Sequence, residues 1–143
     1  MDILMRKYTL FFLILLSSRI ATAQEGVWVV ANVTDQGFSL TKGEVRNLFM
    51  SSGTSKKYVF DPVALSPGNR ARAIFNAKII ALPESRIQSY WAQMRFSGRM
   101  TPPKEFDNLD ALLNYISSTD GAIGYVPADT ELPNNVAIVY RSF

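Results

Sequence analysis

The sequence predicts an α/β domain of three layers, built on a mainly parallel sheet. Predicted strands and helices follow one another in the order β-α-β-α-α-α-β-β, so that most strands are separated by helices. The first predicted strand is a nearly continuous apolar run rich in valine, which is typical of a buried central strand. The chain has 143 residues, of which 48% are hydrophobic and 19% charged, and this balance suits one domain with a modest core.

The composition excludes several classes of protein. The chain has no cysteine and no histidine. Disulfide scaffolds, zinc sites with thiolate or imidazole ligands, cysteine nucleophiles and Ser-His-Asp triads are therefore ruled out. The net charge of +3 is too small and too scattered for a nucleic-acid interface. No paired carboxylates stand out as catalytic, so we expect neither an enzyme nor a cofactor.

Residues 1–23 are predicted to be a cleaved signal peptide. Arg6 and Lys7 precede an apolar run over residues 8–16, and Ala21-Thr22-Ala23 offers small residues at the cleavage site. The alternative is a membrane anchor, but the run is about half of the roughly 20 residues that a spanning helix needs. Cleavage after Ala23 leaves one domain, residues 24–143, with no later segment able to span a membrane. A secreted chain without cysteine fits the bacterial periplasm.

The first half of this domain contains two predicted strands and one clear helix start. Residues 26–33 form the first strand. Thr41 and Glu44 make a capping box, with Leu40 and Val45 placed as a hydrophobic staple, so a helix begins there and ends near residues 51–53. Residues 58–65 form the second strand, in which Pro62 suggests a sheet edge or a bulge.

The second half is predicted to be mostly helical before the chain returns to the sheet. A helix runs from residues 66–69 to about 80, and another begins at Pro83 with Trp91 on its buried face. Residues 96–103 form a loop because they contain glycine and paired prolines. A helix starts at residues 107–110 and ends by Gly121, and residues 122–126 and 136–140 form the last strands.

Three segments together resemble a known family. They are LTKGEVRNLF at residues 40–49, YWAQMRFSGRMTPP at 90–103 and GAIGYV at 121–126. The chain is similar, over residues 27–126, to the short secreted substrate-binding-like proteins of the phosphate-transporter type, which are related to type 2 periplasmic binding proteins. The resemblance implies one lobe of the periplasmic-binding fold, an extracytoplasmic location and no enzymatic activity.

The sequence departs from that family in two respects. Full binding proteins have two lobes that close on the ligand, and residues 24–143 make only one. Their phosphate-binding loop carries a serine-glycine-threonine run at a helix start, where this chain has Ser66-Pro67-Gly68-Asn69-Arg70. Matching the following phenylalanine to Phe75 places Asn69, not Ser66, at the helix cap.

Two turns are candidates for anion binding, because ligands of open α/β sheets lie beyond the carboxyl ends of the strands, near helix N-termini. One turn, residues 32–41, ends at Thr41. The other follows the second strand, and its candidate residues are Ser66, Gly68, Asn69, Arg70 and Arg72. The alternative is that Ser66 or Asn69 only caps the helix and that the arginines are solvated.

A second basic cluster, Arg95, Ser97, Gly98 and Arg99, lies in the predicted loop and faces either the same crevice, a partner or solvent. Taken together, these features predict a periplasmic, non-enzymatic binding-type domain with weak recognition of phosphate or another small oxyanion. The alternative is an interaction or structural module that docks onto an envelope or transporter protein without binding a small ligand.

Overall fold

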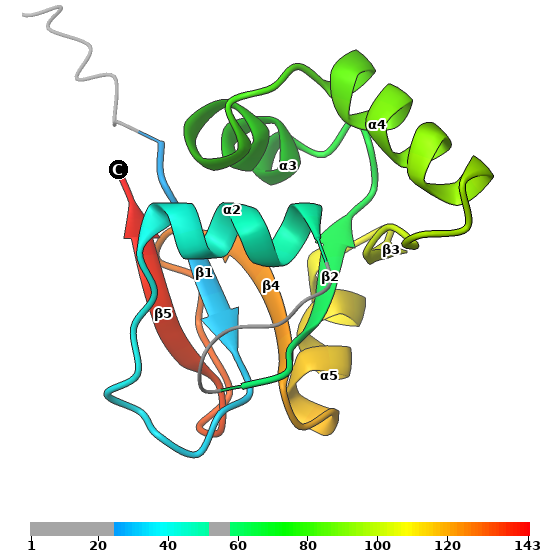
Figure 1. The fold of residues 1–143 in the computed structure, drawn as a ribbon. Coiled ribbons are helices and arrows are strands. Elements are labelled where there is room, and N and C mark those ends of the chain that lie inside the picture. Colours follow the sequence, from blue (N-terminus) through cyan, green and yellow to red (C-terminus); the bar gives the residue numbers. More distant parts are fainter. Residues whose placement is uncertain (1–24, 52–57) are drawn as a thin grey trace, which may run out of the picture.

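The computed structural model describes residues 25–51 and 58–143 (Figure 1). Labels follow Figure 1. The strands are β1 (Val27–Ala31), β2 (Asp61–Leu65), β3 (Lys104–Phe106), β4 (Ala122–Pro127) and β5 (Ala137–Ser142). The helices are α2 (Lys42–Met50), α3 (Arg70–Phe75), the π-helix η1 (Asn76–Ile80), α4 (Glu84–Phe96) and α5 (Leu109–Ser118). The predicted signal peptide, residues 1–23, lies outside the described residues.

The five strands form one sheet in the order β3-β2-β4-β1-β5. Strand β2 is parallel to both β3 and β4, whereas β1 is antiparallel to its neighbours β4 and β5. Four strands therefore point in one direction and β1 alone points in the other. The predicted α/β class with a mainly parallel sheet is confirmed, and the valine-rich run is an interior strand as expected.

Helices cover both faces of the sheet, which confirms the three layers (Figure 1). On one face, the buried ring of Tyr125 stacks on Phe75 of α3, with centroids 4.0 Å apart, and lies 6.0 Å from Phe49 of α2. On the other face, Gly124 lies against Ile116 of α5. Neighbouring residues of β4 point to opposite sides, so each helical layer packs on alternate side chains of the same strand.

Most helix starts agree with the sequence. Thr41 caps α2: its hydroxyl accepts from the Glu44 amide at 3.3 Å, and its own amide donates to the Glu44 carboxylate at 2.8 Å. Asn69 caps α3 by accepting from the Ala71 amide at 2.9 Å. Among the described residues, no helix is long and apolar enough to span a membrane.

Three expectations were wrong in detail. The chain forms β3 directly after the predicted loop, where no strand was expected; it has only three residues, too few to show a period. The predicted helix through residue 80 changes from α to π geometry at Asn76. Pro62 lies in an interior strand and not in an edge strand. The pairing of β2 with β3 begins only at Val63, so on that side no hydrogen bond of the sheet requires an amide at Pro62.

Candidate functional site

The turn after β2 leads directly into α3, and the turn and the first residues of that helix together contain five of the six candidate residues. The Asn69 amide donates to the Ser66 carbonyl at 3.2 Å, which closes the turn. Gly68 has a φ of 92°, a conformation that residues with a Cβ rarely adopt. Asn69 is the N-cap residue, so the alignment that places Asn69 and not Ser66 at the cap agrees with the structure.

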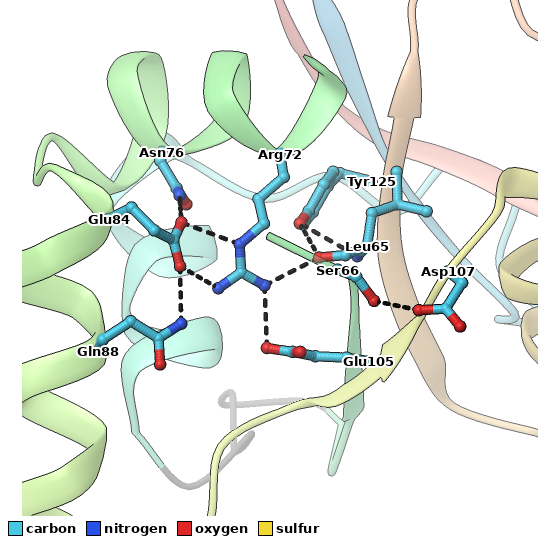
Figure 2. A network of polar contacts seen from close by, with 9 residues as sticks. All are labelled: Leu65, Ser66, Arg72, Asn76, Glu84, Gln88, Glu105, Asp107 and Tyr125. Carbon is cyan, nitrogen blue, oxygen red and sulfur yellow. Dashed lines mark hydrogen bonds and ion pairs between the residues drawn. The ribbon is translucent and has the colours of Figure 1, made fainter. Parts of the chain in front are cut away.

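The Arg72 side chain is the centre of a polar network (Figure 2). Its Nε and Nη2 donate to the two carboxylate oxygens of Glu84, at 3.0 and 2.6 Å. Its Nη1 donates to the Leu65 carbonyl at 2.8 Å and to Glu105 at 3.1 Å. Only 7% of the Arg72 side chain is exposed. Arg72 is therefore not solvated, and most of its donors are already used within the chain.

Two neutral side chains complete this arrangement. Asn76, at the start of the π-helix, donates to Glu84 at 2.7 Å, and Gln88 donates to the other Glu84 oxygen at 2.8 Å. The two oxygens of Glu84 thus accept four hydrogen bonds in all from Arg72, Asn76 and Gln88. These four hydrogen bonds fix the orientation of the Glu84 carboxylate, and the carboxylate in turn holds the Arg72 guanidinium in one position.

The network shifts the protonation of both charged partners. Burial disfavours the charged form of Arg72, but the hydrogen bond to Glu84 and nearby charges outweigh burial and raise the Arg72 pKa. The hydrogen bond from Arg72 lowers the pKa of Glu84. Each group therefore favours the charged form of the other, and both are ionised at neutral pH.

A further carboxylate binds Ser66. The Ser66 hydroxyl donates to Asp107 at 2.8 Å (Figure 2). Glu84, Glu105 and Asp107 together bring three negative charges to the region where Arg72 supplies one positive charge. The chain's own carboxylates thus occupy the donors of Arg72 and Ser66 that an incoming oxyanion would need.

Arg70 has a different environment from Arg72. Its guanidinium contacts both carboxylate oxygens of Glu25, with 2.7 Å between Nε and Oε2. The Arg70 side chain remains 79% exposed and Glu25 48% exposed. An ion pair this exposed contributes about 0–1 kcal/mol, so solvent ions compete with it effectively.

Thr41 lies apart from the other five candidates. Strand β1 runs against its neighbours, so its end at Asn32 meets the beginning of β4, where the Asn32 amide donates to the Ala122 carbonyl at 2.9 Å. The two candidate turns therefore begin at opposite ends of the sheet. The amide of Leu40, next to Thr41, donates a hydrogen bond to the Val139 carbonyl of β5. Strands β4 and β1 lie between β5 and β2. The two candidate turns therefore do not share one crevice.

A small cavity lies beneath α4, beside the network. Its volume is about 50 Å³, and its lining includes Arg72, Gln88, Trp91, Arg95 and Tyr125. That space holds a few water molecules and is far below the roughly 300–1,000 Å³ of ordinary small-molecule pockets. Trp91 is 6% exposed and belongs to the core, as the sequence predicted.

The sequence did not identify Glu84 and Glu105, the two carboxylates that pair with Arg72. Glu84 looked like an ordinary acidic residue in the first turn of a helix, which favours helices by itself. Glu105 lies on the unpredicted strand β3, so nothing placed it near Arg72. The presence of an arginine on the buried face of the predicted helix was the one available signal, because a buried arginine is almost always paired.

No protein-family model matches the sequence, and no curated protein matches it. Solved structures do match the fold. An ABC-type phosphate transport receptor from Vibrio cholerae superposes with a TM-score of 0.60 and 12% identity, covering 80% of this chain and 45% of that chain. A putative phosphate ABC transporter substrate-binding protein with bound phosphate, from Clostridium perfringens, gives a TM-score of 0.58 and 12% identity, covering 80% and 44%.

These matches define the class of fold. The chain has the architecture of part of a phosphate-transport substrate-binding protein, and the resemblance seen in the sequence is confirmed at the level of the fold. It spans less than half the length of either solved structure. The superposition shows a shared fold. At 12% identity, that likeness does not assign the ligand of those proteins to this chain.

Proposed function

We propose that this chain is a non-enzymatic binding-type lobe of the periplasm, and that its recognition of small oxyanions is weak and confined to the turn Gly68–Arg70. The fold of phosphate-transport substrate-binding proteins supports the binding class. The predicted signal peptide supports the location. The contrast between Arg70 and Arg72 supports the restriction to one turn.

That contrast is the observation on which the proposal depends. Arg72 is buried and held by Glu84 and Glu105, so an anion would have to displace two carboxylates from a fixed network. Arg70 is 79% exposed, and an anion would replace only an exposed contact with Glu25. Removing a partner from a buried pair is costly, whereas exchanging an exposed partner costs little.

One lobe also limits the affinity. In a two-lobed protein the closed form surrounds the anion and excludes water, which strengthens every contact. The turn lines a hollow of about 550 Å³ that is open to solvent, so it supplies few donors to an anion, and screening by salt weakens them. We expect phosphate to bind the monomer no tighter than about 0.1–1 mM, or about 4–5.5 kcal/mol.

Calorimetric titration of phosphate into the form Gln24–Phe143 tests the proposal. Arg70→Gln should abolish the binding, whereas Glu25→Gln should strengthen it by up to about fivefold, because the competing carboxylate loses its charge. Arg86→Gln, which changes another exposed arginine, is the matched control and should leave the affinity unchanged. Micromolar affinity, or binding that survives Arg70→Gln, would contradict the proposal.

One observation favours docking onto another surface of the cell envelope as a second function. The end of α4 carries a phenylalanine that is almost completely exposed, beside two arginines. This surface is separate from the turn after β2, and a docking role there is compatible with weak anion binding or with none.

A further inference from the structure

The last turn of α4 displays an apolar side chain to solvent. Phe96 is 97% exposed, more than either of the other large apolar residues identified as exposed in the described chain, Val59 at 79% and Phe143 at 69%. In Figure 1, α4 runs to the outer edge of the molecule, and its last turn lies at that edge, beyond β3. Leaving a whole aromatic ring in water forgoes about 1.5–3 kcal/mol of burial. A side chain in this position is therefore available to something outside the fold.

The position of Phe96 is set by an ordered helix end. The Gly98 amide donates to the Arg95 carbonyl at 3.0 Å, and the Arg99 amide donates to the Met94 carbonyl at 3.1 Å. With Gly98 at a φ of 67°, these two bonds form a Schellman motif. The backbone after Phe96 is thus turned back onto the helix, and the ring remains at the outer end.

The surroundings of this ring are basic. Arg95 and Arg99 are both exposed, and neither has a carboxylate within ion-pair distance among residues 25–51 and 58–143. Arg70 and Arg72, by contrast, are both paired. Met100 is half-buried next to Arg99. We call Arg95, Phe96, Arg99 and Met100 the α4 tip. It combines two uncompensated positive charges with an apolar centre.

We propose that the α4 tip binds the surface of a bilayer that contains anionic lipids. Phe96 enters the boundary between headgroups and acyl chains, and the two arginines contact the lipid phosphates. Aromatic and basic side chains are the types that interfacial membrane binding uses. The positive charge of the tip complements the negative surface of such a bilayer.

The shape of the surface favours a bilayer over a protein partner or a second copy. Stable protein interfaces bury about 1,200–2,000 Å² and place their aromatic anchors at the centre of a broad contact. The α4 tip is one helical turn with the residues that follow it, and it projects from the molecule (Figure 1). A bilayer interface accepts a single projecting ring together with its flanking charges, and binding of this size is weak and reversible.

Vesicle sedimentation tests the proposal with the form Gln24–Phe143. Every contact described above lies within residues 25–143, whereas the apolar run at residues 8–16 would itself bind lipid and must be absent. The protein should partition onto vesicles of phosphatidylglycerol and phosphatidylcholine, and much less onto phosphatidylcholine alone. Raising the salt concentration should release it, because about 1 kcal/mol per basic residue, or about fivefold, depends on the surface charge.

Four variants report on the tip, with two matched controls. Phe96→Ser should lower the partition coefficient by about tenfold or more, and Arg95→Gln and Arg99→Gln by about fivefold each. Phe143→Ser and Arg86→Gln change exposed residues of the same types elsewhere and should have no effect. A Phe96→Trp variant should show a blue-shifted emission when anionic vesicles are added.

Three results would overturn the proposal: no partitioning at millimolar lipid, equal partitioning onto neutral vesicles, or partitioning that survives Phe96→Ser. The result is independent of phosphate recognition, because Arg70→Gln leaves the α4 tip intact and should not alter vesicle binding. Thermal unfolding of Phe96→Ser should match the parent, since the ring has almost no contacts to lose.

Discussion

The carboxylate of Glu84 receives two hydrogen bonds from the guanidinium of Arg72, at 2.6 Å from Nη2 and 3.0 Å from Nε. The pair joins α3 to the first turn of α4, across the π-helix between them (Figure 2). Because both side chains are held by further hydrogen bonds, the pair fixes the position of α3 relative to α4. It also consumes the buried positive charge that the sequence offered as an anion site.

Acid should weaken the fold through Glu84. Arg72 lowers the Glu84 pKa below its ordinary value of 4.5, so the folded chain favours the carboxylate. The stability that Glu84 contributes is therefore present above about pH 4.5 and is lost as the pH falls through the lower pKa of the folded state. Urea unfolding of the parent at about pH 6 and at several values below 4.5 measures this loss.

The variant Glu84→Gln separates this pair from other acidic groups. It should destabilise the domain by about 1–2 kcal/mol at neutral pH, since the hydrogen bonds to Arg72 lose their charge. Its stability should then change less than that of the parent between pH 6 and the acid range. Glu131→Gln alters an exposed carboxylate and should reproduce the parent's dependence on pH. Equal acid sensitivity of Glu84→Gln and the parent would contradict this assignment.

The close approach of α5 to the sheet should make a side chain at Gly124 costly, because the neighbouring Ile116 and Val63 side chains are fully buried and must shift. A Cβ there would lie 2.8 Å from Ile116 Cδ1 and 3.2 Å from Val63 Cγ2. Gly124→Ala should therefore destabilise the domain by about 1–3 kcal/mol in urea unfolding. Gly43→Ala, in the first turn of α2 with open space around it, is the matched control and should be neutral or slightly stabilising.

The two tryptophans should differ in their contribution to stability. Trp91, on the buried face of α4, is 6% exposed, and Trp91→Ala should cost about 3–5 kcal/mol. The Trp28 indole N–H is buried without a hydrogen-bond partner in the described part of the chain. Trp28→Phe removes that unpaired donor and should cost little, because the relief offsets the smaller ring.

Urea unfolding of Trp91→Phe and Trp28→Phe gives the direct comparison, since both variants replace the same side chain by the same ring. Trp91→Phe should cost more. If Trp91→Ala unfolds like the parent, Trp91 is not the core residue described above. If Trp28→Phe is the more costly exchange, the indole N–H has an acceptor.

The secreted form should begin at Gln24. The small residues that end at Ala23 follow the apolar run at the distance that signal peptidase requires. Intact-mass measurement of protein from the periplasmic fraction checks the cleavage site. Material that retains Arg6 and Lys7 would remove the support for the periplasmic location.

The sequence by itself determined the local features of this protein. Thr41 and Glu44 encode their capping box within four residues, because this device needs only near neighbours. For α3 the sequence left Ser66 and Asn69 as alternative caps, and the structure has Asn69, which accepts from the Ala71 amide. The valine-rich run predicted an interior strand, and the alternation of strands and helices predicted the α/β class. Trp91 was assigned to the core from helical spacing alone. Each of these follows from a short-range pattern.

Only the tertiary structure decided the character of the candidate site. The direction of β1 separates the two candidate turns, and strand direction depends on pairing between distant segments. Arg72 meets Glu84 from 12 positions away and Glu105 from 33 positions away, on a strand too short to predict. No local sequence pattern predicts which charges folding will bring together. The sequence therefore predicted Arg72 as an anion ligand, whereas in the fold Arg72 is already paired with Glu84 and Glu105.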